Sequence, residues 1–233
     1  MNAIVTGATK GIGLSIVKHL AANNYNLALC ARNSGELDNL KKQLNASHPN
    51  LTIMMMAADF SKQDEVKAFA DIVDNGFSFI DVLINNAGLF IPSKLMEEND
   101  DDLQRQLQLN VLAPHHLCKY FGRKMQQAGK GHIVNICSIA SVKPTIMAGS
   151  YSISKMALLG LTKILREELM AEGVKVTAVL PGSTLTSSWE GTTIPAGRFI
   201  DPDDIARSIM ACLNMSAGAN VDEIIIRPLR GDL

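Results

Sequence analysis

Two segments of the chain place a tyrosine four residues before a lysine: Tyr151 with Lys155, and Tyr120 with Lys124. Residues four apart lie on the same face of a helix, so the ammonium group can sit beside the phenol. A nearby positive charge stabilises the tyrosinate and lowers a pKa that is ordinarily about 10. A tyrosine in this setting can act as a general acid or base near neutral pH.

The two copies differ in what precedes them. Thirteen residues before Tyr151 is Ser138, whose hydroxyl can hydrogen-bond the same substrate oxygen, whereas Leu107 stands thirteen residues before Tyr120. Tyr120 also lies in the middle of a long helical stretch. The sequence therefore favours Tyr151 and Lys155 as the catalytic pair, with Tyr120 as a packing residue followed by a solvated lysine.

A glycine-rich segment near the start of the chain is the second candidate site. Its glycines follow the spacing Gly-x3-Gly-x-Gly, and the residues of interest are Thr6, Gly7, Lys10, Gly11, Ile12 and Gly13. Glycines let the backbone turn tightly against a pyrophosphate, and the helix that follows offers free N–H groups at its positive end. This pattern predicts a dinucleotide site, although a simple strand-to-helix turn would also need glycine.

The type of dinucleotide is indicated after the second expected strand. That strand is followed by Arg32, with no carboxylate before Glu36. A carboxylate here usually binds free ribose hydroxyls, whereas the planar Arg32 guanidinium suits a 2′-phosphate. Lys10 would add a second positive charge. We therefore expect NADP(H); the alternative is that both cations are ordinary solvated surface residues.

The elements that must position these residues follow from the hydrophobic pattern, which alternates between strand and helix periods. The expected strands are Ala3–Thr6, Asn26–Ala31, Leu51–Ala57, Val82–Asn85, His132–Cys137, Lys175–Leu180 and Asp222–Ile226. The expected helices run from Ile12 onward and over Ser34–Ala46, Lys62–Asn75, Asp101–Gln127, Tyr151–Glu172 and Asp201–Asn214. This order predicts an α/β fold with a doubly wound, mostly parallel seven-stranded sheet of the Rossmann type, in which residues 1–233 form a single domain. Ligands bind such sheets at the carboxyl ends of the strands, where the candidate residues lie.

Composition excludes several classes of partner. The 233 residues carry 22 basic and 23 acidic side chains, so nothing in the charge points to nucleic acid or an anionic membrane. No apolar run approaches the length of a membrane span. The cysteines are widely spaced, which indicates a reducing compartment and a cytoplasmic protein. The adjacent pair His115 and His116 cannot face one site on a helix, and we expect no metal.

Taken together, these residues resemble the single-domain short-chain dehydrogenase/reductases. Five motifs carry the resemblance in order: the glycine segment, 85–88 (Asn-Asn-Ala-Gly) after the fourth strand, Ser138, Tyr151 with Lys155, and 181–186 (Pro-Gly-Ser-Thr-Leu-Thr) after the sixth strand. The resemblance covers nearly the whole chain, from Ala3 to about Ile226.

The resemblance implies roles that the residues alone do not give. Asp59 would hydrogen-bond the adenine amino group, although on its own it could cap the helix beginning near Lys62. Asn110 would hold a water in a proton relay to Lys155, and Thr186 would bind the nicotinamide carboxamide. The remaining cofactor-binding positions would be Asn86, Ala87, Gly88, Tyr151, Lys155, Pro181, Gly182 and Thr184.

The implied reaction is hydride transfer between NADP(H) and a carbonyl or secondary-alcohol substrate, with Tyr151 as the general acid or base. Two alternatives stay open: a 3-oxoacyl-[acyl-carrier-protein] reductase acting on a carrier-bound substrate, and a non-catalytic NADP(H)-binding sensor. Carrier-protein reductases have basic residues where this chain has Gly129 and Glu172, so a small free molecule is favoured, although Lys130 and Lys175 could substitute.

The resemblance also implies how the molecule assembles and closes. A homodimer is expected, with a homotetramer as the alternative, because the chain lacks the C-terminal Asp-Gly-Gly segment of tetrameric members. Residues 185–198 are expected to form a lid over the substrate, with Trp189 and Ile194 as its apolar contacts.

Overall fold

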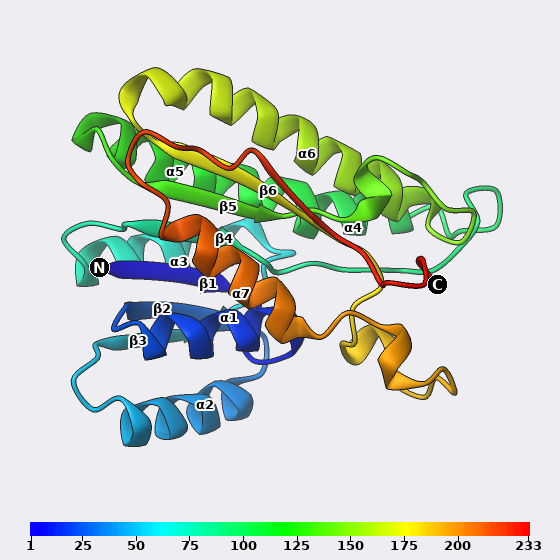
Figure 1. Ribbon diagram of the computed structural model, residues 1–233, viewed down its shortest axis with the longest axis horizontal. Helices are drawn as coiled ribbons and strands as arrows, with labels where there is room; N and C mark the ends of the chain where they lie inside the picture. The colour runs from blue at the N-terminus through cyan, green and yellow to red at the C-terminus, as the bar shows by residue number, and fades with distance from the viewer.

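Seven short runs of mostly aliphatic residues form one sheet in the computed structural model, which describes residues 1–233 (Figure 1). The strands are β1 (Asn2–Thr6), β2 (Asn26–Ala31), β3 (Ile53–Ala57), β4 (Val82–Asn85), β5 (His132–Ile136), β6 (Lys175–Pro181) and β7 (Glu223–Ile226). Their order is β3-β2-β1-β4-β5-β6-β7, and every neighbouring pair is parallel. The predicted fold class is confirmed, with all seven strands parallel.

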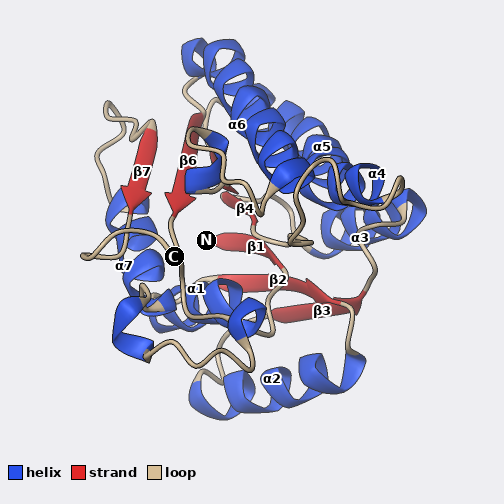
Figure 2. Ribbon diagram, turned by 90° about the vertical axis from the view of Figure 1, so that its right-hand side faces the viewer, coloured by secondary structure: helices blue, strands red, loops and turns tan.

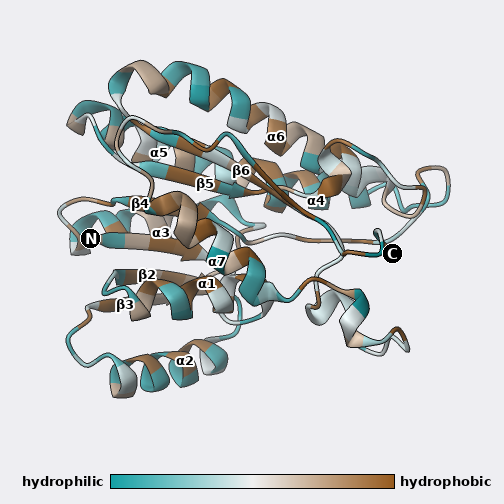
Figure 3. Cartoon of the chain, in the orientation of Figure 1, coloured by the Kyte–Doolittle hydropathy of each residue, from teal (hydrophilic) through white to brown (hydrophobic).

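Helices cover both faces of this sheet (Figure 2). One face carries α1 (Gly11–Ala22), α2 (Ser34–Ser47) and α7 (Pro202–Leu213), and the other carries α3 (Gln63–Gly76), α4 (Asp102–Leu107), α5 (Ala113–Ala128) and α6 (Gly149–Leu169). Two large apolar clusters fill the two interfaces. The central strands are therefore buried on both sides, and Figure 3 shows brown, hydrophobic strands between helices whose outer turns are largely teal.

Two of the helices begin at a side-chain cap, and α5 ends at a glycine. The Asn33 side chain accepts the Glu36 N–H at the start of α2, and Asp201 accepts the Asp203 N–H at the start of α7. Gly129 ends α5 in the left-handed conformation, which glycine adopts without strain. No helix is both long and apolar enough to cross a bilayer.

The predicted long helix Asp101–Gln127 is present as continuous helical backbone over residues 102–128, but it contains an irregularity that the pattern did not predict. A π-helical turn at Gln108–Leu112 separates α4 from α5. Pro114 has no N–H to donate to the carbonyl of Asn110, one helical turn earlier, so the regular hydrogen-bond pattern cannot continue. The π-helical turn thus includes Asn110, a residue that the resemblance places in the active site.

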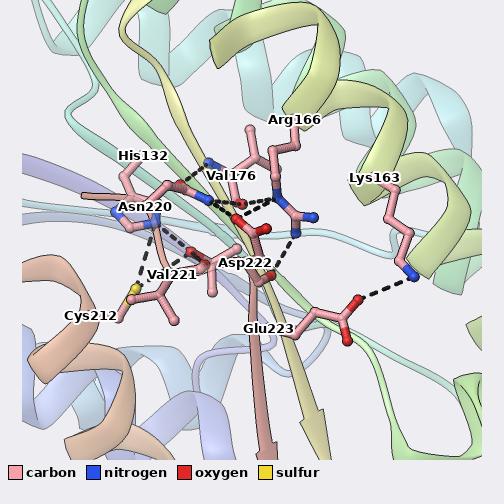
Figure 4. A network of polar contacts seen from close by, with 10 residues as sticks. His132, Lys163, Arg166, Val176, Cys212, Asn220, Val221, Asp222 and Glu223 are labelled. Carbon is pink, nitrogen blue, oxygen red and sulfur yellow. Dashed lines mark hydrogen bonds and ion pairs between the residues drawn. The ribbon is translucent and has the colours of Figure 1, made fainter. Parts of the chain in front are cut away.

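A partly buried polar network fastens the last strand at the end of the sheet away from the candidate site (Figure 4). Arg166 of α6 donates to the carbonyl oxygens of Val176 (2.9 Å) and Asp222 (2.6 Å), and Lys163 pairs with Glu223 at 3.2 Å. These contacts satisfy one carbonyl near the start of β6 and one just before β7. They hold the edge strand against β6.

Candidate active site

The candidate residues gather at the carboxyl ends of the central strands. The glycine segment follows β1, the segment 86–88 follows β4, Ser138 follows β5, and Pro181 ends β6. The order of strands reverses between β1 and β4, and this switch point is where open α/β sheets bind ligands.

The glycine segment is braced against the end of β4. The Thr6 hydroxyl accepts the N–H groups of Asn86 (3.0 Å) and Ala87 (2.9 Å), and the Asn86 amide donates to the carbonyls of Thr6 (2.9 Å) and Gly7 (3.1 Å). A Cβ added to Gly13 would overlap the Gly7 carbonyl oxygen, which explains why no side chain is possible there. Thr6 is buried, so its hydroxyl shapes the loop from within.

The start of α1 is open for a ligand. Lys10, the residue before the helix, makes no side-chain cap, and the first turn holds no acidic residue. Gly11 has a φ of +51°, and a Cβ there would lie 3.0 Å from the Thr186 methyl carbon. The uncapped N–H groups and the glycine cradle fit a pyrophosphate, with the 181–186 segment directly beside them.

The two cations expected at a 2′-phosphate differ in whether they form an ion pair within the protein. Arg32 is exposed directly after β2, whereas the Lys10 ammonium pairs with the Glu36 carboxylate at 3.0 Å. The hydrogen bond between them raises the pKa of Lys10 and lowers the pKa of Glu36. The charge of Lys10 is therefore balanced within the protein, a pairing that sequence reasoning missed.

Asp59 accepts two hydrogen bonds from one neighbour. Its Oδ1 takes the backbone N–H (3.0 Å) and the hydroxyl (2.8 Å) of Ser61, while α3 starts only at Gln63. Burial opposes ionisation of this half-buried carboxyl, but the Ser61 hydrogen bonds outweigh it and lower the pKa of Asp59. Asp59 is therefore not a cap of α3, and its second oxygen takes no hydrogen bond from the protein.

The structure brings Ser138, Tyr151 and Lys155 together. Lys155 is 4% exposed, its Nζ donates to the Ile136 carbonyl at 2.7 Å, and it lies 5.8 Å from the centre of the Tyr151 ring. Burial lowers the pKa of Lys155 to about 8. Ser138 is also buried, and its Oγ accepts the Ala140 N–H at 3.1 Å.

The Tyr151 phenol does not show the lowered pKa that its spacing from Lys155 predicts. Burial raises the pKa of Tyr151 to about 12, and a hydrogen bond with the Ser138 side chain acts in the opposite direction. The Lys155 ammonium donates to the Ile136 carbonyl, and burial lowers the pKa of Lys155 itself. In this state the Tyr151 phenol keeps its proton at neutral pH, which suits an acid.

Asn110 lies beside this group, at the π-helical turn. It is fully buried, and its amide bonds the N–H (2.7 Å) and carbonyl (2.9 Å) of Leu89 and the Ser154 hydroxyl (2.9 Å). A Cβ on Gly88 would lie 3.4 Å from Asn110 Oδ1 and 3.6 Å from Lys155 Nζ. Both N–H groups of the Asn110 amide are used, so a water in a relay could bind only as a donor, to the second lone pair of Asn110 Oδ1 or to the Asn110 backbone carbonyl.

The second Tyr-Lys pair serves a different purpose. The Tyr120 hydroxyl donates to Asp71 (3.1 Å) and Asp74 (3.3 Å), and Lys124 pairs with Asp74 at 2.8 Å. Burial and the carboxylates raise the pKa of Tyr120 to about 12. The pair ties α5 to α3, and Lys124 is an ion-pair partner rather than a simply solvated lysine.

Two aromatic contacts near the site carry no signal in the sequence. The Phe90 ring packs edge to face on the Tyr151 ring, with centroids 4.8 Å apart, and Phe90 is still 38% exposed. Trp189 packs on Phe199 at 4.9 Å, which anchors the expected lid. That lid consists of loop and two short 3₁₀ turns, at Ser187–Trp189 and Ala196–Arg198.

The segment after β6 is held by its neighbours. The Gly182 N–H donates to the Ile226 carbonyl at 2.8 Å, and the buried Thr184 hydroxyl donates to the Gly182 carbonyl at 2.9 Å. The Leu233 N–H donates to the Ser183 hydroxyl at 3.1 Å, so residues after β7 reach this edge of the sheet as well. No group of His, Cys, Asp or Glu side chains converges in a way that could hold a metal ion.

Comparison with known proteins shows the family to which the chain belongs. The family model described as short chain dehydrogenase matches residues 1–194. An uncharacterised oxidoreductase of Staphylococcus aureus is 30% identical over 230 residues, covering 97% of this chain and 96% of the relative.

Solved structures of similar fold also include members of this family. A metagenomic short-chain oxidoreductase in complex with NADP is 30% identical with a TM-score of 0.85, covering 98% of this chain and 96% of the other. An alcohol dehydrogenase from Thermococcus sibiricus, complexed with 5-hydroxy-NADP, is 26% identical with a TM-score of 0.91 and the same coverage. The fold, the order of motifs and these matches agree: the chain belongs to the short-chain dehydrogenase family.

Proposed function

We propose that this protein is an NADP(H)-dependent oxidoreductase that interconverts a carbonyl compound and the corresponding secondary alcohol. The observation that carries the proposal is the convergence of Ser138, Tyr151 and Lys155 beside Gly88, next to an uncapped helix start. Structures similar to this chain were solved with NADP or NADPH bound, which supports the choice of cofactor.

Each side chain of the group has a distinct task in this proposal. Tyr151 donates its proton to the carbonyl oxygen during reduction and removes a proton from the alcohol in reverse. Ser138 hydrogen-bonds the same oxygen and orients it. Lys155 brings a positive charge beside the phenol, which lowers the cost of forming tyrosinate once the site is filled.

The cofactor site is assigned from the open cradle. The Gly11 and Ile12 N–H groups would face the pyrophosphate, Arg32 would bind the 2′-phosphate, and Thr186 would contact the carboxamide. When bound, NADP(H) would supply or accept the hydride, while the protein supplies position and proton. Asp59 offers one unpaired carboxylate oxygen for the adenine amino group.

The substrate we favour is a free carbonyl compound with an apolar substituent. Phe90 lies against Tyr151, and the segment between Ser138 and α6 exposes Val142 (50%), Ile146 (77%) and Met147 (53%). Apolar side chains exposed so close to a catalytic group favour an apolar ligand surface.

A carrier-bound substrate has less support. Lys130 lies over the Phe79 ring at 4.8 Å, and the Lys175 ammonium donates to the carbonyls of Ser216 (2.5 Å) and Met215 (3.2 Å). Both lysines that could replace the missing basic residues are therefore already engaged.

The experiment is a screen of NADPH oxidation against ketones, diketones, quinones and acyl thioesters, with NADPH binding followed by fluorescence. We expect NADPH to bind and at least one ketone to be reduced. Binding without turnover of any carbonyl would instead support a sensor, and turnover confined to acyl thioesters would support the carrier-protein reductase.

We also propose a cytoplasmic homodimer. All four cysteines are buried free thiols, as expected in a reducing compartment. The outer face of α6 exposes Ile153, Met156 and Ile164, which share one side of the helix and would be covered by a second copy.

A further inference from the structure

The loop between β4 and α4 lies directly on the first turn of α6. The Gly149 N–H donates to the Ser93 carbonyl at 3.1 Å, and a Cβ added to Gly149 would lie 2.9 Å from the Leu95 nitrogen. The helix that carries the proposed catalytic pair therefore begins against this loop. Its start has no cap from Ala148, the residue that precedes it.

Glu98 supplies the missing cap from 52 residues away. Its carboxylate accepts the Ser150 backbone N–H at 3.3 Å and also the Ser150 hydroxyl. Ser150 is 1% exposed and immediately precedes Tyr151. The first turn of α6 contains no acidic residue of its own, and Glu98 brings a carboxylate to the positive end of the helix.

The same loop is anchored at its other end by the helical segment around the π turn. Asn110 bonds both backbone groups of Leu89, and the Gln106 side chain accepts the Ile91 N–H at 3.2 Å. Phe90 lies between Leu89 and Ile91 in the chain, and its ring packs on Tyr151. The loop is thus fixed on both sides of the residue that touches the phenol.

We infer that Glu98 is a positioning residue for Tyr151: it joins the loop that carries Phe90 to the helix turn that carries the phenol. This inference rests on the proposed function, because it assigns Glu98 a role in the proton transfer by Tyr151. Glu98 acts through Ser150 and touches no reacting atom.

The arrangement predicts a specific kinetic signature. Most of α6 is secured by buried residues such as Leu158, Leu159 and Leu165, so loss of the cap loosens only its first turn. Lys155 lies one turn further on and is held by the Ile136 carbonyl. Turnover should therefore fall while the affinity for NADPH stays the same.

The test compares Glu98→Ala and Glu98→Gln with Glu97→Ala. Glu97 is the matched control because its carboxylate is exposed, pairs with Lys94 at 2.7 Å and makes no hydrogen bond to α6. Small displacements of a catalytic group cost about tenfold to a hundredfold in rate. In Glu98→Ala we expect kcat to fall by this factor, with the Kd for NADPH within twofold of the parent. In Glu98→Gln we expect a near-parental kcat, because the amide oxygen can still accept the Ser150 N–H. Glu97→Ala should change neither quantity.

Ser150→Ala keeps the inference testable if Glu98→Ala does not fold. It should lower kcat less than Glu98→Ala, and the double variant should be no worse than Glu98→Ala alone, because the two residues form one contact. Amide hydrogen exchange at residues 150–152 should quicken in Glu98→Ala, a readout that does not depend on activity.

The possible failures are distinguishable. A parent protein that binds NADPH but turns over no carbonyl contradicts the proposed function. A parent that turns over, with parental kcat in Glu98→Ala and Ser150→Ala, overturns the positioning role. A loss of stability with unchanged kcat would do the same.

Discussion

The Lys10 ammonium lies 3.0 Å from the Glu36 carboxylate, at the edge of the site where we place the 2′-phosphate of NADP(H). The hydrogen bond between the two groups raises the pKa of Lys10 and lowers the pKa of Glu36, so each group stabilises the charge of the other. A phosphate arriving here would compete with Glu36 for Lys10. Glu36 is thus an acid that the expected ligand must displace or tolerate.

Glu36→Gln should therefore bind NADPH more tightly than the parent. Removing the carboxylate frees Lys10 and removes repulsion of the phosphate, and an exposed pair of this kind supports a gain of about two- to fivefold. NADH, which lacks the phosphate, should bind unchanged. Fluorescence titration with both cofactors at low salt measures the ratio, and weaker NADPH binding in Glu36→Gln would contradict the assignment.

Arg32→Ala should have the opposite and larger effect. Arg32 is exposed after β2 and free to bind a 2′-phosphate, and loss of a charge-assisted hydrogen bond weakens affinity by about tenfold to a hundredfold. NADH affinity should change little. Arg123→Ala, an exposed arginine on α5, is the control. Equal affinity of the parent for NADH and NADPH would contradict the assignment of Arg32 to the 2′-phosphate.

Tyr151→Phe and Tyr120→Phe should separate the two Tyr-Lys pairs. Each removes one hydroxyl and keeps the ring, so both variants should fold and bind NADPH. General acid catalysis contributes about 10²- to 10⁴-fold, and turnover should fall by that much only in Tyr151→Phe. Tyr120→Phe loses its contacts to Asp71 and Asp74 and should lose only stability. Normal turnover in Tyr151→Phe would show that the proton comes from another group.

Lys155→Met should lower activity without lowering the stability of the fold. Burial shifts the pKa of Lys155 from 10.5 to about 8, so keeping its charge in the folded protein costs on the order of 3 kcal/mol at neutral pH. Methionine removes that cost but leaves the Ile136 carbonyl without its donor. The variant should lose turnover and NADPH affinity, yet be as stable as the parent or up to about 2 kcal/mol more stable at pH 7.

The stability difference should depend on pH in one direction. Between about pH 8 and 10.5 the unfolded parent keeps the Lys155 proton while the folded parent loses it, so the stability of the parent rises relative to the variant. Urea unfolding without cofactor at pH 7, 9 and 10 measures this trend. An advantage of Lys155→Met that grows with pH would contradict the burial argument.

Assembly through α6 can be tested by placing a charge on its exposed face. Ile164 is 58% exposed there, so Ile164→Glu should convert the proposed dimer to a monomer. Ile72→Glu makes the same change on α3, where Ile72 is 46% exposed, and should leave the dimer intact. Light scattering at micromolar concentration reads both. A parent that is already monomeric would contradict the proposal.

The sequence alone was sufficient for the fold because the signals are local and repeated. Aliphatic runs ended by polar or glycine residues gave the seven strands, and the helices between them required parallel pairing. Since the carboxyl ends of parallel strands share one edge, Ser138 and the glycine segment had to lie at the same end. Pro114, four residues after Asn110, was a readable signal for the π-helical turn within the long helix.

Tertiary structure alone decided the electrostatics and the contacts across the chain. The tyrosine–lysine spacing predicted a lowered Tyr151 pKa, but burial, which no local pattern encodes, raised it. The pairing of Lys10 with Glu36 and the cap of Glu98 on Ser150 depend on where a loop packs against a helix. Sequence periodicity specifies which face of an element is buried, whereas a charge–charge distance depends on how separate elements pack, and that is set by the whole core.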